Sequence, residues 1–310
     1  MKNCKIIMYH YVRPIKLSSF PSIKGLELEG FRRQIEFFQK KFNFISMNKL
    51  LDCIYKNEKL PQNSILLTFD DGFKDHYQYV FPLLKKLGIP GAFFPPALPI
   101  VENRILDVHK IHFILASTSN HQLIVKEIFD LIKQFSNDHE LQKPEDYFSQ
   151  LAIPNRFDSK ETIFIKRILQ RNLPLTLRNE ITNLLFKKFV KRSENEFSSQ
   201  LYMNFDEIHE MCENNMYFGS HTYSHQWLSY LSPDELEKEI QLSLKFCNDI
   251  GSDTNNLVMC YPYGNYDENV ISKLMKSNFK AGLTTNVGDS IISNKNIFSL
   301  ERYDTNDFPQ

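Results

Sequence analysis

The sequence predicts an α/β fold in which parallel strands and helices alternate around a barrel. Seven short apolar runs resemble strands, and most of them are continuous, which suits strands buried on both faces of a parallel sheet. Patterns with helical spacing lie between the runs, and this alternation is typical of a βα architecture. Polar residues follow the ends of several runs, which is where a (β/α) barrel carries its active site.

Apolar runs predict the strands, and the periodic segments between them predict the helices. In chain order, the predicted strands are 5–10, 64–70, 91–95, 217–221, 257–261, 280–284 and 297–302. The predicted helices of the barrel are 30–42, 75–87, 232–248 and 267–277. The second of these helices ends at Gly88, a natural C-cap, while Ser232, Pro233 and Glu235 are typical of a helix start.

Residues 97–205 interrupt the alternation of strands and helices. The stretch is polar, has few strand signals and contains predicted helices at 106–116, 123–135 and 175–191. About a hundred residues is too long for a structureless loop in a compact domain. We therefore expect a single domain spanning residues 1–310, with 97–205 as a mainly helical insertion over one side of the barrel.

Composition and charge exclude several classes of protein. Basic and acidic residues number 37 each, so the net charge is zero. No stripe of basic residues indicates nucleic acid as a partner. The 42% hydrophobic and 24% charged residues are ordinary for a globular protein. No segment approaches the roughly 20 apolar residues of a transmembrane segment.

The cysteines and the N-terminus predict the compartment. The five cysteines are odd in number and show no CxxC spacing, which favours free thiols in a reducing compartment. The N-terminus lacks the long apolar core of a signal peptide. If this is the full natural chain, it is expected to be cytoplasmic; its oligomeric state is not predicted.

Two adjacent carboxylates end the second predicted strand. Asp70 and Asp71 follow the apolar residues 65–67 and precede Gly72. Repulsion between the two charges is costly unless a cation lies nearby, which favours a metal site. The alternative is a structural turn, because aspartate bonds local backbone and glycine accepts a positive φ. Taken alone, the motif does not separate these two interpretations.

Two histidines, His221 and His225, lie four residues apart after another predicted strand. They share a face if the segment is helical, although an isolated pair with this spacing is more often structural. One carboxylate and two imidazoles are enough protein ligands for an open catalytic zinc site. Position 222 is threonine, so the segment differs from HExxH, and a base would have to come from Asp70 or Asp71.

Four further features near strand ends are candidates for the same site. His10 would protonate a leaving amine if it faces the metal, although a lone histidine is usually structural. Arg302 would orient a carboxylate through a bidentate pair, although most arginines lie on the surface. The turn 261–264 (YPYG) would point a backbone N–H at an oxyanion, or is a plain proline–glycine turn. Trp227, the only tryptophan, would stack on a sugar, with core packing as the alternative.

Together these motifs resemble the polysaccharide deacetylase superfamily, which has a NodB homology domain and is also called carbohydrate esterase family 4. Residues 68–72 match its TFDDG motif, residues 221–225 match its H-[ST]-x-x-H motif, and residues 261–264 resemble the YPYG form of its third motif. The resemblance covers about 1–95 and 205–305 and leaves the insertion unaccounted for. It implies a distorted (β/α)7-type barrel and a divalent metal, usually zinc.

By position, the resemblance implies a role for each motif residue. Asp71, His221 and His225 would be the metal ligands, and Asp70 would be the base that activates water beside the metal. The water would attack an N-acetyl carbonyl. The metal and a backbone N–H near Tyr263 would stabilise the oxyanion.

The sequence departs from the family pattern at two places, and at each place a different residue is expected to take over the role. The arginine that often opens the third motif is absent, since Cys260 and Tyr261 stand there, and Arg302 is expected to brace Asp70 instead. The family's C-terminal Leu-x-x-x-His is also absent. Some members carry an early Tyr-His pair near the first strand, as this chain does, which makes His10 the candidate acid.

The sequence therefore predicts a metal-dependent hydrolase that removes the acetyl group from an N-acetylated sugar, with Trp227 and Tyr261 contacting the substrate. Because a cytoplasmic enzyme does not meet finished wall polymer, we expect a nucleotide- or lipid-linked precursor of a surface polysaccharide. Two alternatives stay open: an O-acetyl ester hydrolase acting on a glycan, and a non-catalytic carbohydrate-binding relative. An intact Asp70 argues against the latter, because a binding module needs no base.

Overall fold

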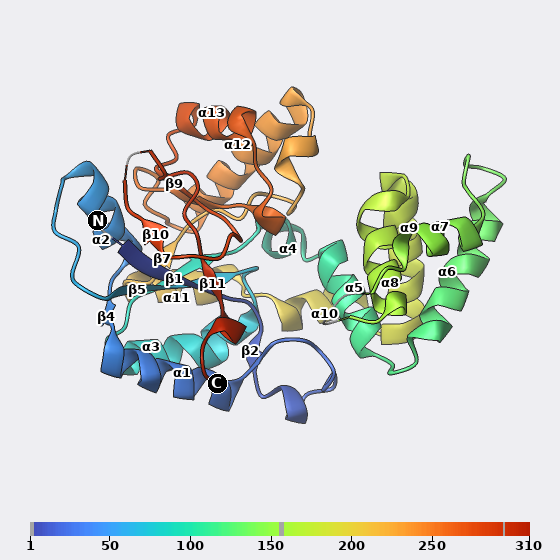
Figure 1. Ribbon diagram of the computed structural model, residues 1–310, viewed down its shortest axis with the longest axis horizontal. Helices are drawn as coiled ribbons and strands as arrows, with labels where there is room; N and C mark the ends of the chain where they lie inside the picture. Colours follow the sequence, from blue (N-terminus) through green and yellow to red (C-terminus); the bar gives the residue numbers. More distant parts are fainter. Residues whose placement is uncertain (1–2, 155–157, 294) are drawn as a thin grey trace. The chain divides into compact units, whose positions relative to one another are not determined.

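Seven parallel strand segments close into a barrel in the order in which they occur along the chain. Figure 1 shows helices around these strands. The structure, a computed structural model, describes residues 3–154, 158–293 and 295–310. The barrel strands are β1 (Asn3–Tyr9), β5 (Ser64–Asp70), β6 (Gly91–Phe94), β7 (Tyr217–Phe218), β8 (Val258–Cys260), β9 (Ala281–Leu283) and β11 (Tyr303–Asp304). Strands β1, β5, β6 and β7 pair in parallel, as do β8 and β9, and β11 returns to pair with β1.

Two isolated parallel bridges complete the barrel. One joins Ser220, just after β7, to Met259 in β8, and the other joins Leu283 in β9 to Leu300. Pairing at these two joins is reduced to a single bridge, whereas β1 and β5 pair over six residues. The barrel is therefore distorted, and the predicted fold class, a distorted (β/α)7-type barrel, is confirmed.

One predicted strand is wrong in its position. Where the sequence predicts a strand at 297–302, residues 295–298 form a turn, Leu300 makes a single bridge, and β11 covers only Tyr303–Asp304. Ile297 and Phe298 are nevertheless buried. A short apolar run indicates that its residues are buried, and buried residues can form a turn as well as a strand.

Strand β5 carries the two aspartates on a rigid element, because all seven of its residues are buried. Its successive side chains belong to different hydrophobic clusters: Leu66 packs in one, while Ile65 and Leu67 pack in the other. Apolar side chains thus cover both faces of the strand, which explains why its sequence is continuous rather than alternating.

Helices and short strands surround the barrel. The helices are α1 (Leu28–Lys41), α2 (Met47–Tyr55), α3 (Phe81–Leu87), α4 (Ala97–Glu102), α11 (Phe205–Glu213), α12 (Pro233–Asp249) and α13 (Glu268–Lys276). The short strands are β2 (Val12–Arg13), β3 (Leu26–Glu27), β4 (Asn43–Phe44) and β10 (Ser290–Ile291). β2 pairs with β3, β4 adds to β5, and β10 runs antiparallel to β1.

Two predicted helix ends are confirmed by their capping contacts. Gly88 closes α3 with φ of 65°, and its N–H donates to the carbonyl of Leu84. Ser232 and Glu235 form a capping box at the start of α12, each side chain accepting from the backbone N–H of the other residue. Such contacts satisfy backbone groups that have no partner inside the helix, so they set where a helix begins and ends.

The chain divides into two units. The barrel unit comprises Met1–Pro14, Gly25–Arg104 and Ser198–Gln310, and the helical unit comprises Ile15–Lys24 and Ile105–Phe197. The helices of the helical unit include α5 (Asp107–Ala116), α6 (His121–Phe135), α7 (Pro144–Leu151), α8 (Lys160–Arg167), α9 (Leu175–Leu185) and the first half of α10 (Glu194–Leu201). The helices predicted at 106–116, 123–135 and 175–191 correspond to α5, α6 and α9.

Aromatic packing explains why Ile15–Lys24 belongs to the helical unit. The ring of Phe20 meets those of Phe113 and Phe197 edge-on, at centroid distances of 5.0 and 5.8 Å. The sequence analysis did not assign this early segment to the helical part. The predicted organisation of residues 1–310 as one domain stays a prediction.

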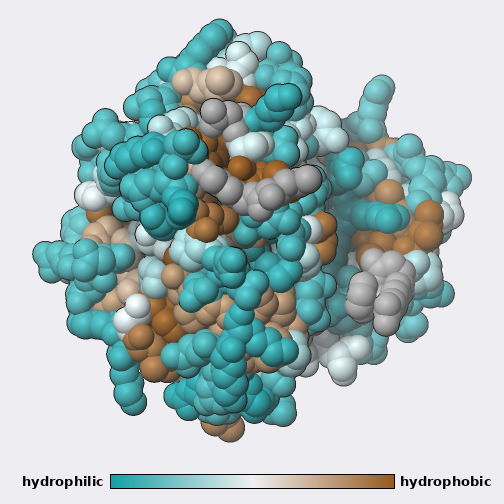
Figure 2. Space-filling model, turned by 60° about the vertical axis from the view of Figure 1, so that its left-hand side comes forward, coloured by the Kyte–Doolittle hydropathy of each residue, from teal (hydrophilic) through white to brown (hydrophobic). Residues whose placement is uncertain are grey.

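Among the residues that the structure describes, no helix combines the length and the apolar character needed to cross a membrane. On the face drawn in Figure 2, hydrophilic side chains predominate and hydrophobic ones form separate patches.

Candidate active site

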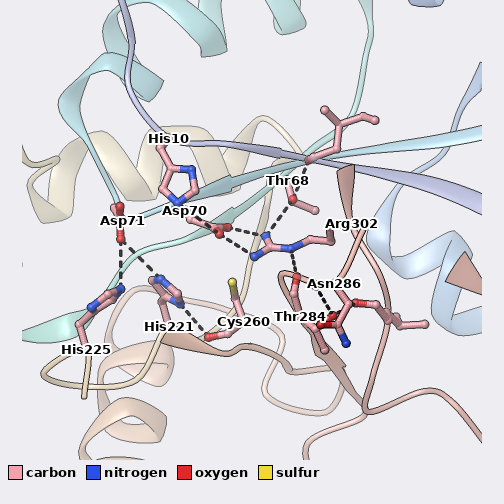
Figure 3. A network of polar contacts seen from close by, with 12 residues as sticks. His10, Thr68, Asp70, Asp71, His221, His225, Cys260, Thr284, Asn286 and Arg302 are labelled. Atoms are coloured by element: carbon pink, nitrogen blue, oxygen red, sulfur yellow. Dashed lines mark hydrogen bonds and ion pairs between the residues drawn. The ribbon is translucent and has the colours of Figure 1, made fainter. Parts of the chain in front are cut away.

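The polar residues singled out in the sequence lie together at the carboxyl ends of the barrel strands (Figure 3). His10 follows β1, Asp70 ends β5, His221 follows β7, and Arg302 lies between the Leu300 bridge and β11. The carboxyl ends of parallel strands meet at one face of a barrel, so residues far apart in sequence become neighbours. The barrel unit therefore holds the whole group.

A buried ion pair joins Asp70 to Arg302. Nη1 of the guanidinium donates to Oδ1 at 2.9 Å, and Nη2 lies 2.8 Å from Oδ2. Each residue is only 1% exposed. A bidentate pair of this kind fixes the orientation of the carboxylate as well as its charge. The structure thus brings Arg302 to the carboxylate that it was expected to brace.

The surroundings of Asp70 keep its carboxylate ionised. Burial raises the pKa of Asp70, but the charges of Arg302, His221 and His10, together with the hydrogen bond from Arg302, outweigh burial and hold the pKa below its usual range. At neutral pH the group can therefore accept a proton but has none to donate.

Backbone carbonyls hold Arg302 in place. Its Nε donates to the carbonyl of Thr284 at 2.7 Å, and its backbone N–H donates to the carbonyl of Asn286 at 2.8 Å. Nη1 also donates to the hydroxyl of Thr68 at 3.2 Å. The sequence analysis missed Thr284 and Asn286, because no local pattern marks a carbonyl that will accept from a distant arginine. Thr68 belongs to the matched TFDDG motif, but no role was predicted for its hydroxyl.

Asp71, His221 and His225 converge beside this ion pair. Oδ1 of Asp71 lies 3.5 Å from Nε2 of His221 and 3.5 Å from Nε2 of His225. One donor atom from each residue lies within 4.8 Å of the others, and none of the three residues is more than 8% exposed. Carboxylate oxygen and imidazole nitrogen are zinc ligands, and three protein ligands leave a position open. This donor set fits the predicted divalent metal.

The orientation of His221 suits a metal ligand. Its Nδ1 lies 2.7 Å from the carbonyl oxygen of Cys260, and because a carbonyl only accepts, Nδ1 carries the proton. With a metal bound, the ring would be neutral and would present the lone pair of Nε2 toward Asp71 and the ligand position. Metal-binding histidines usually have their second ring nitrogen held in this way.

The two histidines do not share a helix face. Residues 221–225 form a loop in which Thr222 and His225 have φ of 64° and 58°. This left-handed backbone is uncommon for residues other than glycine and persists where the surroundings determine it. The Thr222 hydroxyl accepts from the N–H of His225 at 3.0 Å. A tight loop, and not helical spacing, brings the two imidazoles together.

Glu239 of α12 holds the same loop. Its carboxylate accepts from the backbone N–H of Tyr223 at 3.1 Å and from that of Ser224 at 2.9 Å. The sequence analysis missed Glu239, since an acidic residue on an amphipathic helix is typical of a surface position.

His10 lies at the exposed edge of the group. Its Nε2 is 4.0 Å from Oδ2 of Asp70, and its side chain is 41% exposed. This distance exceeds that of a hydrogen bond but lies within the range over which charges influence each other. The structure thus places His10 beside Asp70, and its role as the acid stays a prediction.

Trp227 and Tyr263 form an aromatic pair next to His225. The rings of Trp227 and Tyr263 are stacked, with centroids 4.3 Å apart and planes inclined by 6°. The ring of Tyr263 meets the imidazole of His225 edge-on at 4.7 Å. Both aromatic residues are partly exposed. Neither of the two alternatives considered for Trp227, stacking on a sugar or packing in the core, is decided by this position.

The prediction that Tyr261 contacts the substrate is wrong. Its side chain is in the core: the residue is 1% exposed, its hydroxyl donates to the carbonyl of Phe298 at 3.0 Å, and its ring stacks on that of Tyr266. Burial of a tyrosine ring is favourable once the hydroxyl has an acceptor, and the Phe298 carbonyl supplies one. The side chain of Tyr261 does not reach a substrate from there.

Comparisons with known proteins add to this geometry. The sequence profile described as "Polysaccharide deacetylase" matches residues 57–130 and 179–282, more than half of the chain. No curated protein matches the chain significantly.

Solved structures of several deacetylases share the fold. A Streptococcus pyogenes deacetylase, PplD, in complex with acetate is 18% identical with a TM-score of 0.60, covering 97% of this chain and 92% of that one. IcaB from Ammonifex degensii is 17% identical with a TM-score of 0.52, covering 92% and 85%. A de-N-acetylase from Aggregatibacter actinomycetemcomitans is 14% identical with a TM-score of 0.54, covering 98% and 95%. At these identities the likeness is one of fold.

Proposed function

Because this chain belongs to the polysaccharide deacetylase family, we propose that it is a metal-dependent carbohydrate deacetylase acting on an N-acetylated sugar. One observation carries the proposal. Asp70 is held ionised by Arg302 directly beside the donor set of Asp71, His221 and His225. A base next to a metal site is what hydrolysis of an unactivated amide requires.

Asp71, His221 and His225 would hold the metal, for which zinc suits the donors best. A bound divalent metal would polarise the acetyl carbonyl and lower the pKa of a water molecule. The hydrogen bond from His221 to the Cys260 carbonyl supports this role, since it keeps Nε2 available as a ligand.

Asp70 would accept the proton of the attacking water while the water oxygen forms its bond to the acetyl carbon. Arg302 contacts both carboxylate oxygens, so it orients the base and keeps it ionised before the reaction. The backbone N–H of Tyr263 would donate to the oxyanion that forms at the acetyl oxygen.

His10 would protonate the nitrogen as the C–N bond breaks, so that acetic acid and a neutral amine leave. An amide nitrogen is a poor leaving group without this proton, whereas an ester oxygen needs it less. The position of His10, 4.0 Å from Asp70, supports this assignment and thereby supports N-acetyl over O-acetyl substrates. One protein of similar fold is described as a de-N-acetylase.

For the sugar itself, we propose that the stacked pair of Trp227 and Tyr263 forms one wall of the binding site. Aromatic faces are suitable platforms for sugar rings, and both residues are partly exposed beside His225. The substrate class that we propose is a nucleotide- or lipid-linked precursor of a surface polysaccharide. This rests on the cysteine usage, which is typical of a reducing compartment.

Acetate release from a panel of N- and O-acetylated sugars tests the function. The zinc-loaded protein is expected to release acetate from N-acetylated sugars and to leave equimolar free amine. Release from O-acetylated sugars alone would identify an esterase instead. Binding of the sugars with no release from any of them would identify a carbohydrate-binding relative.

Metal binding can be predicted separately from turnover. The metal-free protein is expected to bind one equivalent of zinc, measured by calorimetry. The variant H225A should bind it more weakly than the wild type by more than the roughly 10- to 100-fold that outer-shell changes cost. His209 is an exposed histidine whose ring contacts a backbone carbonyl, so H209A is the matched control and should bind zinc normally. Equal affinities for both variants would place the metal elsewhere.

A further inference from the structure

The segment that carries His10 is fastened to the segment that follows the two aspartates. Nε2 of His76 lies 2.8 Å from the carbonyl oxygen of His10. One residue on, the ring of Tyr11 stacks on that of Phe73, with centroids 4.0 Å apart. Beyond it, Nε of Arg13 donates to Asp75 at 2.6 Å. Three contacts in succession thus tie residues 10–13 to residues 73–76.

In these contacts, His76 is a hydrogen-bond donor whose ring is held in place by its neighbours. It is fully buried, and its ring lies against those of Phe69, Phe73 and Phe93 at centroid distances of 5.5 to 5.9 Å. Burial lowers the pKa of His76 to about 4, so the ring is neutral at physiological pH. Because the carbonyl of His10 only accepts, the proton of the neutral ring is on Nε2.

The side chain of His10 has little else to hold it. It is 41% exposed, and within the described ranges its imidazole has one ionic contact, at 4.0 Å from Asp70. The position of such a side chain is set mainly by its backbone. The backbone of His10 is in turn held by a residue that lies five positions after Asp71 on the same chain segment.

We propose that His76 is a positioning residue, which holds the His10 backbone so that the imidazole stands at the correct distance from Asp70. The inference rests on the proposed function, in which His10 protonates the leaving nitrogen. His76 would touch neither substrate nor metal. Through one hydrogen bond, it would fix the position of His10 relative to Asp70 and to the metal ligand Asp71.

Two substitutions separate the hydrogen bond from the packing of the ring. H76F keeps an aromatic ring among its phenylalanine neighbours but removes the donor, whereas H76Q places an amide N–H near the position of Nε2. A misplacement of about 1 Å can cost roughly 10²-fold, so kcat of H76F on an N-acetylated sugar should fall about 10- to 100-fold. KM should change by less than about twofold, and H76Q should recover most of the loss.

The leaving group distinguishes a misplaced acid from general damage. The leaving group of 4-nitrophenyl acetate departs without protonation, so H76F should hydrolyse this ester at nearly the wild-type rate. H10A should show the same selective loss on the amide, to a greater extent. An equal loss on both substrates, or H76Q as impaired as H76F, would overturn the positioning role.

Hydrogen exchange tests the contact without any turnover. The backbone amides of residues 10–13 should exchange faster in H76F than in the wild type or H76Q, while those of the distant helix α13 stay unchanged. Unchanged exchange at residues 10–13 would refute the proposal even if the enzyme is active. If the wild type releases no acetate, the proposed function fails, and exchange still decides whether His76 holds this segment. If H76F does not fold, H76N, whose amide is too short to reach the carbonyl, replaces it in the comparison with H76Q.

Discussion

Replacing Asp70 with asparagine is expected to lower kcat for acetate release by roughly 10² to 10⁴, the range that general bases contribute. Asparagine keeps the shape and one carbonyl oxygen but cannot take the proton from water. The reduction should appear in kcat, with KM nearly unchanged, because Asp70 is buried and its carboxylate pairs with Arg302. Steady-state acetate release measures it.

Two measurements keep this result interpretable. Zinc affinity of D70N should match the wild type, since Asp71, His221 and His225 are unchanged. D253N alters an exposed aspartate that caps a surface turn, and it should leave turnover unaffected. D70N turnover within about twofold of wild type would show that Asp70 is not the base, whatever else the site does.

The second large effect is on stability: R302M should lower the free energy of unfolding by about 3–5 kcal/mol, as breaking a buried ion pair typically does. Methionine fills much of the arginine volume but leaves Asp70 buried without its counter-charge. It also leaves the carbonyl of Thr284 without the guanidinium that donates to it. Urea denaturation of R302M against the wild type measures the loss.

A surface pair provides the matched control for this prediction. Arg32 pairs with Glu29 on helix α1, with both side chains more than half exposed. R32M should change stability by less than about 1 kcal/mol, because exposed ion pairs contribute little. In the double variant D70N/R302M the destabilisation should be smaller than the sum of the two single effects, since no lone buried charge remains. Additive effects would show that the pair is not coupled.

Much of the barrel could be predicted because local patterns determine its elements. The buried strand β5 shows as a continuous apolar run, and the ends of α3 and α12 show in Gly88 and in the Ser232 capping box. These signals depend on neighbours within four or five residues. The last strand could not be placed, because Ile297 and Phe298 are buried in a turn and apolar character does not reveal the backbone conformation.

The candidate site divides in the same way. Asp70, Asp71, His221 and His225 were found from two motifs, whose residue types suit a metal and a base. Tyr261 belongs to a third motif, yet its side chain faces the core. A motif names the residues near a site but does not say where each side chain points.

By itself, the sequence determined the family, the βα alternation and the residue types that a metal-dependent hydrolysis requires. Only the tertiary structure decided how these residues act on one another. Asp70 and Arg302 are 232 positions apart, and the contact between His76 and the carbonyl of His10 spans 66. No local pattern encodes such contacts, because they depend on which strand ends meet when the barrel closes. The charge of Asp70 and the position of His10 both follow from that closure.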